Sequence, residues 1–475
     1  MPFSFLPRPL RRGALALLLP LTGSTAFRAP QQVKEPDPQV IAQFGLLNNA
    51  PLQKFIDVKG QQMAAVSNRA GYGYNFTIVD SPIINAFAAP DGNVYFTRGI
   101  MAHFNNEAQF AGVLGHEIGH ITARHGDKQK TRSTLATGAL LLGSILSSRV
   151  AQLAQPLSQG VGLLFLKYGR DDERQADELG VAYSTKIGYD AAQMADFFQT
   201  LQREQEVSGA GQVPDFLSSH PNSADRYATV KKLAATAKRN VGGRQLTVNR
   251  NGYLRMLEGL PYGEDPRQGF VETGVFYHPD LKFKFPIPSG WKSQNSPQQF
   301  QMAEPNGKAV LILTSAGNGA LEATAQNLAE QLKLQSPQAS RTTLNGLPAI
   351  AIQGEQVGQD QSGQTGVTAS TLSYIIQDGK MLYALIGLCG PGTLSAYGPQ
   401  FQRSAQGFAR LTEASKLNRQ PEKIRIRTAK AGQTLASALA ANGVSSKRYE
   451  ELAILNGMRT TDKMSPGMLY KVVGK

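Results

Sequence analysis

The chain has 475 residues, of which 41% are hydrophobic and 18% charged, so it is not a disordered polymer and has room for about three globular domains. Its formal net charge of +14 fits an anionic membrane or cell-wall surface, or a charge that serves solubility alone. The lysines and arginines are scattered and follow no nucleic-acid-binding pattern, which argues against a nucleic-acid partner. The single cysteine, Cys389, excludes an internal disulfide and a cysteine-ligated zinc site, so a metal must be held by histidines and carboxylates.

The first 26 residues have the composition of an export signal. Arginines precede the short apolar run 13–21, and small residues lead to a cleavage point after Ala26. The apolar run is too short for a stable membrane span. We therefore expect an exported protein whose residues 1–26 are a signal peptide, with a retained N-terminal anchor as the alternative.

Residues 36–262 carry mainly helical patterns. In chain order we expect strands at 76–79 and 93–97, then a helix from Glu107 and further helices at 134–146, 171–187, 191–206 and 223–237. Asn105 and Asn106 provide a helix start before Glu107. The apolar segments 137–146 and 161–166 are too short to cross a bilayer. They are interpreted either as a hydrophobic lid near the cleft, with peripheral membrane or client contact, or as ordinary core helices.

Residues 116–120 read His-Glu-Ile-Gly-His and lie in the helix that begins at Glu107. Residues four apart share one helix face, so His116 and His120 can direct both imidazoles at one metal ion. Glu117 lies beside that face and can reach a water on the ion. Two histidines with an adjacent carboxylate predict a catalytic zinc site in which Glu117 is the general base.

A third protein ligand is expected for catalytic zinc. His125 follows His120 by five residues and should lie off the metal-facing side, as a helix-end or supporting group. Glu173 is the better candidate, because it lies on a second predicted helix with Asp177 one turn later on the same face. Asp177 could orient either histidine through its free ring nitrogen. The alternative is a solvated acidic helix start.

This pattern of HExxH followed by ExxAD resembles the HtpX/BepA-type family of zinc metallopeptidases, of gluzincin type. Residues 84–88 and 92–99 resemble the family's NAFA segment and the strand after it, and residues 219–226 resemble its HP…R segment. The resemblance covers about 230 residues, with its motifs in the family's order. It implies a mainly helical zincin-type domain with one Zn²⁺ held by His116, His120 and Glu173.

The resemblance also implies roles for residues around that site. In periplasmic members a histidine of the HP segment can occupy the fourth zinc position and keep the enzyme latent, a role that His220 would take here. His220 could instead stabilise the oxyanion or simply stand at a helix boundary. Arg226 is expected to pair with a carboxylate near the site. The strand formed by Asn85, Ala86, Phe87 and Ala88 is expected to add an extended substrate peptide at its edge.

A Pro- and Gly-containing linker at 261–266 precedes two further units. Residues 270–415 predict an α+β, sandwich-like domain, and 283–291 resemble the opening of PsbP-like domains. Its expected strands are 281–286, 309–314, 349–352 and 382–386, its helices 320–334 and 398–410, and an exposed connection covers 354–367.

Residues 422–475 resemble a LysM-like βααβ module, with landmarks at 431–435, 455–456 and 466–467. The resemblance implies possible binding of peptidoglycan; the alternative is a small βααβ domain that packs on the protease.

The leading hypothesis is an exported zinc-dependent endopeptidase, in the bacterial periplasm, that cleaves misfolded or unassembled envelope proteins by a zinc-activated water. Its expected partners are protein substrates, with peptidoglycan or outer-membrane assembly components as further candidates. The alternative is a zinc-closed, chaperone-like or peptidoglycan-associated binding protein with little proteolytic activity.

Overall fold

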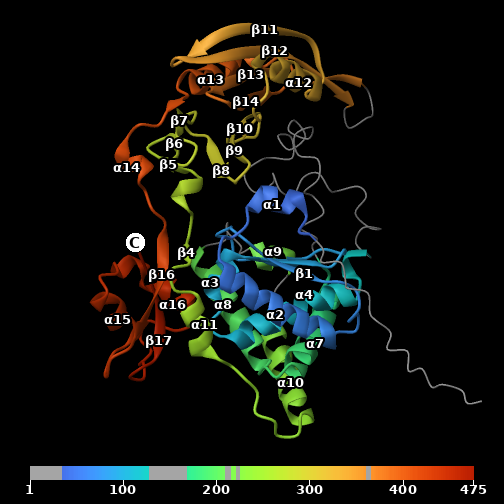
Figure 1. The fold of residues 1–475 in the computed structure, drawn as a ribbon, viewed down its shortest axis with the longest axis vertical. Helices are drawn as coiled ribbons and strands as arrows, with labels where there is room; N and C mark the ends of the chain where they lie inside the picture. Colours follow the sequence, from blue (N-terminus) through green and yellow to red (C-terminus); the bar gives the residue numbers. More distant parts are fainter. Residues whose placement is uncertain (1–34, 128–167, 209–214, 221–224, 360–364) are drawn as a thin grey trace, which may run out of the picture.

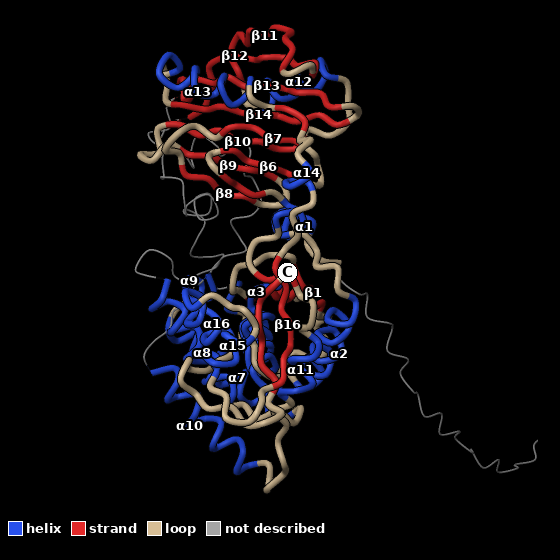
Figure 2. Tube along the Cα trace, turned by 90° about the vertical axis from the view of Figure 1, so that its left-hand side faces the viewer, coloured by secondary structure: helices blue, strands red, loops and turns tan. Residues whose placement is uncertain are grey.

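The computed structural model describes residues 35–127, 168–208, 215–220, 225–359 and 365–475. The chain forms a helical lobe and a strand-rich lobe, joined by extended connections (Figures 1 and 2). The predicted signal peptide and the predicted hydrophobic lid lie outside the described residues. Within the described part, no helix is long and apolar enough to span a bilayer.

The helical lobe contains a small sheet with helices packed around it. Its elements are α1 (Pro38–Phe44), α2 (Ala50–Val66), β1 (Asn75–Val79), β2 (Ala86–Ala88), β3 (Asn93–Thr97), α3 (Arg98–His103), α4 (Glu107–Thr122), α7 (Arg170–Lys186), α8 (Ala192–Ser208), α9 (Asp215–Ser219), α10 (Asp225–Asn240) and α11 (Arg250–Met256). The sheet order is β1-β3-β2, so β2 is an edge strand. As predicted, α4 begins after Asn106, whose side chain accepts a hydrogen bond from the amide of Gln109.

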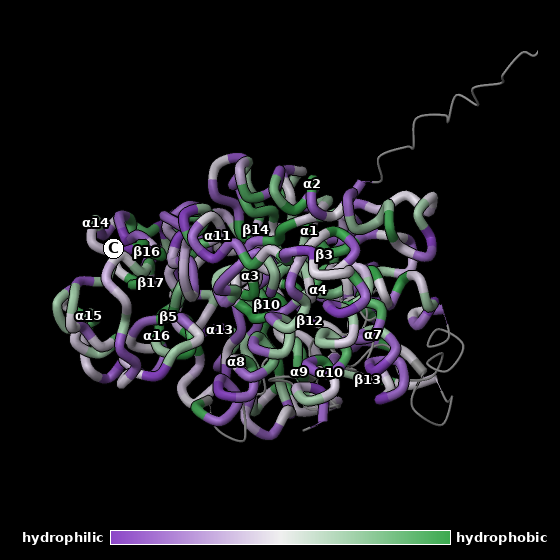
Figure 3. Tube along the Cα trace, turned by 90° about the horizontal axis from the view of Figure 1, so that it is seen from below, coloured by the Kyte–Doolittle hydropathy of each residue, from purple (hydrophilic) through white to green (hydrophobic). Residues whose placement is uncertain are grey.

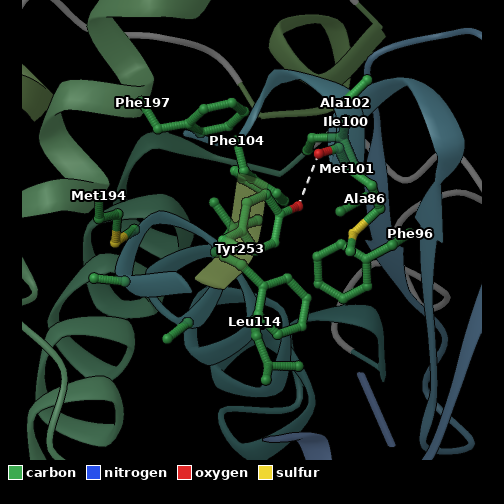
Figure 4. Packing of buried hydrophobic residues seen from close by; sticks show 14 of the residues in the cluster. Ala86, Phe96, Ile100, Met101, Ala102, Phe104, Leu114, Met194, Phe197 and Tyr253 are labelled. Carbon is green, nitrogen blue, oxygen red and sulfur yellow. Dashed lines mark hydrogen bonds between the residues drawn. The ribbon is translucent and has the colours of Figure 1, made fainter. Parts of the chain in front are cut away.

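Aromatic side chains fill the centre of this lobe (Figure 4). Phe104 packs against Phe197, with ring centroids 4.6 Å apart, and both side chains are fully buried. The buried Tyr253 hydroxyl donates to the carbonyl of Met101 at 2.7 Å, so the polar end of this ring is satisfied inside the core. This packing holds α11 against α3 and supports α4 from below the metal-facing side.

The strand-rich lobe contains two antiparallel sheets. Its elements are η2 (Pro266–Gln268), β5 (Phe270–Glu272), β6 (Val275–His278), β7 (Phe283–Pro286), β8 (Lys292–Asn295), β9 (Gln299–Ala303), β10 (Ala309–Ser315), α12 (Leu321–Gln331), β11 (Leu334–Leu344), β12 (Leu347–Gln359), β13 (Thr365–Asp378), β14 (Met381–Cys389), α13 (Leu394–Gln406), β15 (Ala409–Arg410) and α14 (Ala414–Leu417). The sheet orders are β11-β12-β13-β14-β10-β9-β8 and β15-β7-β6-β5.

Side chains of the central strands point alternately into two cores. On β10, Val310 and Ile312 join the core under α12, whereas Leu311 and Leu313 join the core under α13 and the smaller sheet. Strands buried on both faces read as near-continuous apolar runs, as most of β10 and β14 do. Hydrophobic stretches of the chain lie near the labels of these two strands in Figure 3.

Two expectations for this lobe are corrected. The segment 354–367, expected as an exposed connection, is mostly strand, because β12 continues to Gln359 and β13 starts at Thr365. The expected hairpin is present, but most of these residues belong to its two strands rather than to the connection between them. The helix expected at 398–410 spans Leu394–Gln406 instead, with Pro399 inside it, and it is placed by the buried Phe401 and Ala405.

After the strand-rich lobe the chain returns to the helical lobe. The elements of this C-terminal unit are β16 (Glu422–Thr428), α15 (Leu435–Ala441), η3 (Ser446–Arg448), α16 (Tyr449–Leu455) and β17 (Leu469–Gly474). Strand β16 pairs with β17 and with β4 (Pro261–Tyr262), which precedes the strand-rich lobe. Buried residues of this unit and of the helical lobe form one continuous hydrophobic core. The strand-rich lobe is therefore an insertion between β4 and β16.

Candidate metal centre

Glycines bring α4 and α7 into close contact. A Cβ atom on Gly115 would lie 2.9 Å from the carbonyl oxygen of Gly180, and one on Gly119 would lie 3.2 Å from that of Ala176. Real Cβ contacts are rarely so short, so the two helices approach at positions that carry no side chain. This approach places the first turn of α7 opposite the HExxH face of α4.

Four side chains from three segments converge there: His116 and His120 from α4, Glu173 from α7 and His220 after α9. One donor atom of each lies within 4.8 Å of the others, and all four residues are buried. The Nε2 atoms of His116 and His120 are 3.0 Å apart, and His220 Nδ1 lies 3.0 Å from Glu173 Oε1. The sequence-predicted histidines and Glu173 thus face one another across a small volume.

A second layer of charged groups supports this cluster. Asp177 Oδ1 lies 2.9 Å from His116 Nδ1, so of the two histidines this carboxylate orients His116. Arg226 donates to both Asp177 oxygens, at 2.8 and 2.7 Å, and its Nη1 lies 3.0 Å from Glu173 Oε2. Burial opposes ionisation of Asp177, but Arg226 and His116 hold the pKa of its carboxyl below the ordinary value.

Glu117 differs from the other acidic groups of the centre. It is fully buried, and neither of its carboxylate oxygens makes a hydrogen bond within the described residues. Its Oε1 lies 3.7 Å from His220 Nε2. Burial raises the pKa of Glu117 above the ordinary value of a carboxyl group.

His125 lies outside the cluster of four, yet its ring contacts that cluster. Its Nδ1 is 2.9 Å from His120 Nδ1, on the side of the His120 ring away from His116. Sequence spacing placed His125 off the metal-facing side of a continuous helix. The helix instead ends at Thr122, and the backbone turns at Arg124, whose φ is +58°.

Sequence reasoning missed Tyr168. Its ring stacks on the ring of His120, with centroids 3.8 Å apart and planes inclined by 24°, and its amide donates to the carbonyl of Ser219. Tyr168 therefore links the segment before α7 to the end of α9. A single aromatic residue two positions before a helix carries no sequence signal for such a contact.

The predicted substrate strand lies beside the cluster, at the free edge of its sheet. Ala86 and Phe87 are buried and Ala88 is half-buried. The side-chain amide of Asn85 makes no hydrogen bond within the described residues. The amide of Phe216 in α9 donates to the carbonyl of Ile84 at 3.0 Å. The segment that carries His220 is thus attached to the chain just before β2.

The residues present fit a divalent metal. Two imidazole nitrogens and a carboxylate form the donor set that Zn²⁺ takes in catalytic centres, and His220 adds a further nitrogen. The paired Nε2 atoms of His116 and His120 cannot both carry a proton at 3.0 Å without repulsion. A cation between them, balanced by Glu173, explains this approach.

An HExxH helix with a glutamate from a second helix defines the gluzincin class of metallopeptidase centre. The family described as peptidase family M48 matches residues 51–234. Residues 51–234 are thus similar to peptidase family M48, which supports the HtpX/BepA-type resemblance.

Relatives are similar over about two fifths of the chain. The beta-barrel assembly-enhancing protease of Escherichia coli is 28% identical over 200 residues, which are 40% of this chain and 40% of that protein. The mitochondrial metalloendopeptidase OMA1 of Arabidopsis thaliana is 30% identical over 195 residues, or 40% and 37% of the two chains. The match thus spans about two fifths of these relatives.

A solved structure of PsbP from Synechocystis matches with a TM-score of 0.24 and 14% identity, covering 30% of this chain and 96% of that one. Such a TM-score is too low to support an argument about the strand-rich lobe.

Proposed function

We propose that the chain is a zinc-dependent endopeptidase. The observation that carries the proposal is the convergence of His116, His120 and Glu173 beside the unpaired carboxylate of Glu117. The family and the named metalloendopeptidase relatives support the same reaction class. We propose one Zn²⁺ per chain, held by His116, His120 and Glu173.

The bound ion would supply Lewis-acid activation of water and of the scissile carbonyl. Glu117 takes the proton of the attacking water and passes it to the leaving amine. Its pKa, raised by burial, suits a group that must accept and then release a proton. Asp177 holds the His116 ring through Nδ1, and Arg226 fixes Asp177 and Glu173 relative to each other.

The proposed substrate is an extended segment of a misfolded or unassembled envelope protein in the bacterial periplasm. Such a segment can add to the edge of β2, where the side-chain amide of Asn85 offers a donor and an acceptor. The printed name of the Escherichia coli relative favours clients or partners from outer-membrane β-barrel assembly. The predicted signal peptide supports export.

We propose that His220 controls access to the metal centre. Its Nδ1 lies 3.2 Å from His116 Nε2, in the position of a fourth donor, and Glu117 is fully buried. With a metal bound, His220 in this arrangement would take the position that a substrate or water needs. The same burial favours a second candidate function, a zinc-closed, chaperone-like or peptidoglycan-associated binding protein.

Cleavage of an unfolded protein such as casein tests both candidates. We expect Glu117→Gln to retain zinc but to lose about 10²- to 10⁴-fold in cleavage rate. We expect His220→Ala to raise the rate, whereas His278→Ala, a histidine change in β6 of the strand-rich lobe, should leave it unchanged. A His220→Ala protein that is folded, binds zinc and cleaves nothing would favour the binding protein.

A further inference from the structure

A line of polar side chains leads from His120 away from the metal-facing side. His120 Nδ1 lies 2.9 Å from His125 Nδ1, and His125 Nε2 lies 3.0 Å from Gln175 Oε1 on α7. Asp172 Oδ1, also on α7, is 3.5 Å from the same His125 nitrogen. Both histidines are buried, so the contact between them is shielded from water, whereas Gln175 is exposed and Asp172 is half-buried.

The backbone conformation at the end of α4 brings His125 into contact with His120. The amide of Ala123 still bonds to the carbonyl of Gly119, but Arg124 adopts a left-handed conformation with a φ of +58°. A continuous helix would carry His125 past the His120 side. The turn at Arg124 brings the His125 ring back, with its centroid 5.0 Å from that of His120. A non-glycine residue at positive φ marks a position where surrounding contacts hold the backbone.

The distances leave two possible arrangements of the ring protons of His120 and His125. Two ring nitrogens 2.9 Å apart share one proton. If His120 presents a bare Nε2 toward the metal, its proton is on Nδ1 and is donated to His125 Nδ1. His125 then carries its own proton on Nε2, which faces two oxygen acceptors, Gln175 Oε1 and Asp172 Oδ1. If His125 Nδ1 donated to His120 Nδ1 instead, the proton of His120 would lie on Nε2 and face the metal. His125 Nε2 would then present a lone pair to both oxygens.

The two metal-facing histidines therefore have different partners. His116 donates from Nδ1 to the carboxylate of Asp177. The pocket already contains Glu117, Glu173 and Asp177, with Arg226 as the nearby arginine. A carboxylate at Nδ1 of His120 would place a further negative charge among them, and burying an additional ion is costly because it loses its hydration. A neutral imidazole orients His120 without that charge.

We propose that His125 is a positioning residue which, with Gln175 as its acceptor, locks His120 in the Nδ1–H tautomer, so that Nε2 is free for the metal. The inference rests on the proposed function only in taking His120 as a metal donor. Tyr168 also positions His120, because its ring stacks on one face of the His120 ring and limits rotation of the His120 side chain.

Zinc affinity of the full chain, measured by competition with a chelator, tests the lock. His125→Leu removes the acceptor and should weaken zinc binding about 10- to 100-fold, in the range of other supporting groups of metal ligands. His125→Asn keeps an oxygen acceptor near the place of Nδ1 and should restore most of that loss. His278→Leu serves as the matched control, since His278 lies in β6 of the strand-rich lobe. A folded His125→Leu protein with zinc affinity within about twofold of wild type would overturn the proposal.

The tautomers of the unmodified protein provide a second test that needs no variant. Long-range ¹H–¹⁵N spectra of histidine-labelled protein should show His120 protonated at Nδ1 and His125 protonated at Nε2. A proton on Nδ1 of His125 would contradict the proposed lock whatever the zinc affinities are. If the tautomers and the zinc affinities agree with the lock while casein is not cleaved, the proposed peptidase function fails and the lock stands.

Discussion

Arg226 links two carboxylates of the centre, Asp177 and Glu173. It is buried, bonds to both oxygens of Asp177, reaches Glu173, and its guanidinium carbon lies 4.2 Å from the centroid of the Phe198 ring. A lysine could not replace this planar fork, because an ammonium group cannot engage two carboxylates with the same geometry. The residue therefore sets the spacing between a proposed metal donor and the group that orients His116.

We predict that Arg226→Leu destabilises the metal-free protein by about 3–5 kcal/mol, since two buried carboxylates lose their cation. Denaturant unfolding in the presence of a chelator measures this change in the free energy of unfolding. Arg239→Leu, on the exposed side of the same helix, should change it by less than about 0.5 kcal/mol. Equal effects of the two changes would show that the buried ion pairs contribute no special stability.

Residue types and spacing were sufficient to predict part of the centre. The i, i+4 spacing of His116 and His120 and the acidic start of α7 predicted three groups that the structure brings together with His220. Spacing kept His125 out of the ligand set, as a helix-end or supporting group, but it did not predict the turn at Arg124, whose positive φ changes the direction of the chain. Tyr168 was missed because its role depends on a ring contact across segments distant in sequence from His120.

At the scale of elements, the α4–α7 contact determines whether Glu173 reaches the histidines. We predict that Gly115→Ala weakens zinc binding and destabilises the helical lobe by about 1–3 kcal/mol, because the new Cβ would lie 2.9 Å from the backbone of Gly180. Zinc competition and thermal unfolding measure the two effects. Alanine within a helix normally stabilises relative to glycine, so the expected sign is the reverse of the helix propensity.

Gly398→Ala in α13 is the matched control for that steric argument. A Cβ there would meet only the side chain of Leu394, at 3.6 Å, which is ordinary contact. We expect this change to stabilise the strand-rich lobe by about 0.5–1 kcal/mol and to leave zinc binding unchanged. A similar loss of zinc binding in both variants would rule out close helix packing as the cause.

Strand β17 carries an unusual inward-facing lysine. Lys471 is fully buried and its Nζ donates to the carbonyls of Ala102 at 2.7 Å and Phe104 at 3.1 Å, at the junction of α3 and α4. Burial, together with the charge of Arg250, holds the pKa of Lys471 well below its ordinary value. A neutral amine has two N–H donors, and these two carbonyls accept both.

This lysine makes the stability pH-dependent in the alkaline range. The unfolded chain binds a proton at Lys471 below about pH 10.4 that the folded chain does not bind until its lower pKa is reached. The free energy of unfolding therefore rises with pH through that window, with at most about 1.4 kcal/mol per pH unit from this group. Lys471→Met should remove that part of the slope, whereas Lys430→Met, at an exposed position, should leave it. Parallel slopes in denaturant titrations of all three proteins would contradict the prediction.

At the scale of the whole molecule, the strand-rich lobe interrupts a structural unit that continues on both sides of it. Strands β4 and β16 are antiparallel, with Tyr262 opposite Glu422 and Pro261 opposite Lys423. Antiparallel neighbours can be joined by a short turn. Sequence patterns did not predict this closure, because a pairing between strands far apart in the chain leaves no local signal, and lysine is a residue type that is rarely buried.

We predict that replacing residues 264–420 by a short hairpin turn leaves a folded protein that binds zinc with nearly wild-type affinity. Removing residues 422–475 should instead expose the shared core and abolish cooperative unfolding, since that core includes buried residues of β16, α15, α16 and β17. Circular dichroism melts and zinc competition measure both outcomes. A stable, zinc-binding protein after removal of 422–475 would show that the C-terminal unit only rests on the helical lobe.

The bond from Lys471 to the carbonyl of Ala102 joins residues 369 positions apart in sequence. A ribosome delivers a chain from its N-terminus, so the HExxH helix emerges long before the strand that supports it. During that interval the strand-rich lobe can fold, whereas the helical lobe still lacks β17. Under the proposed function, a nascent chain would therefore complete its metal centre, and could cleave itself or its neighbours, only after synthesis has passed β17.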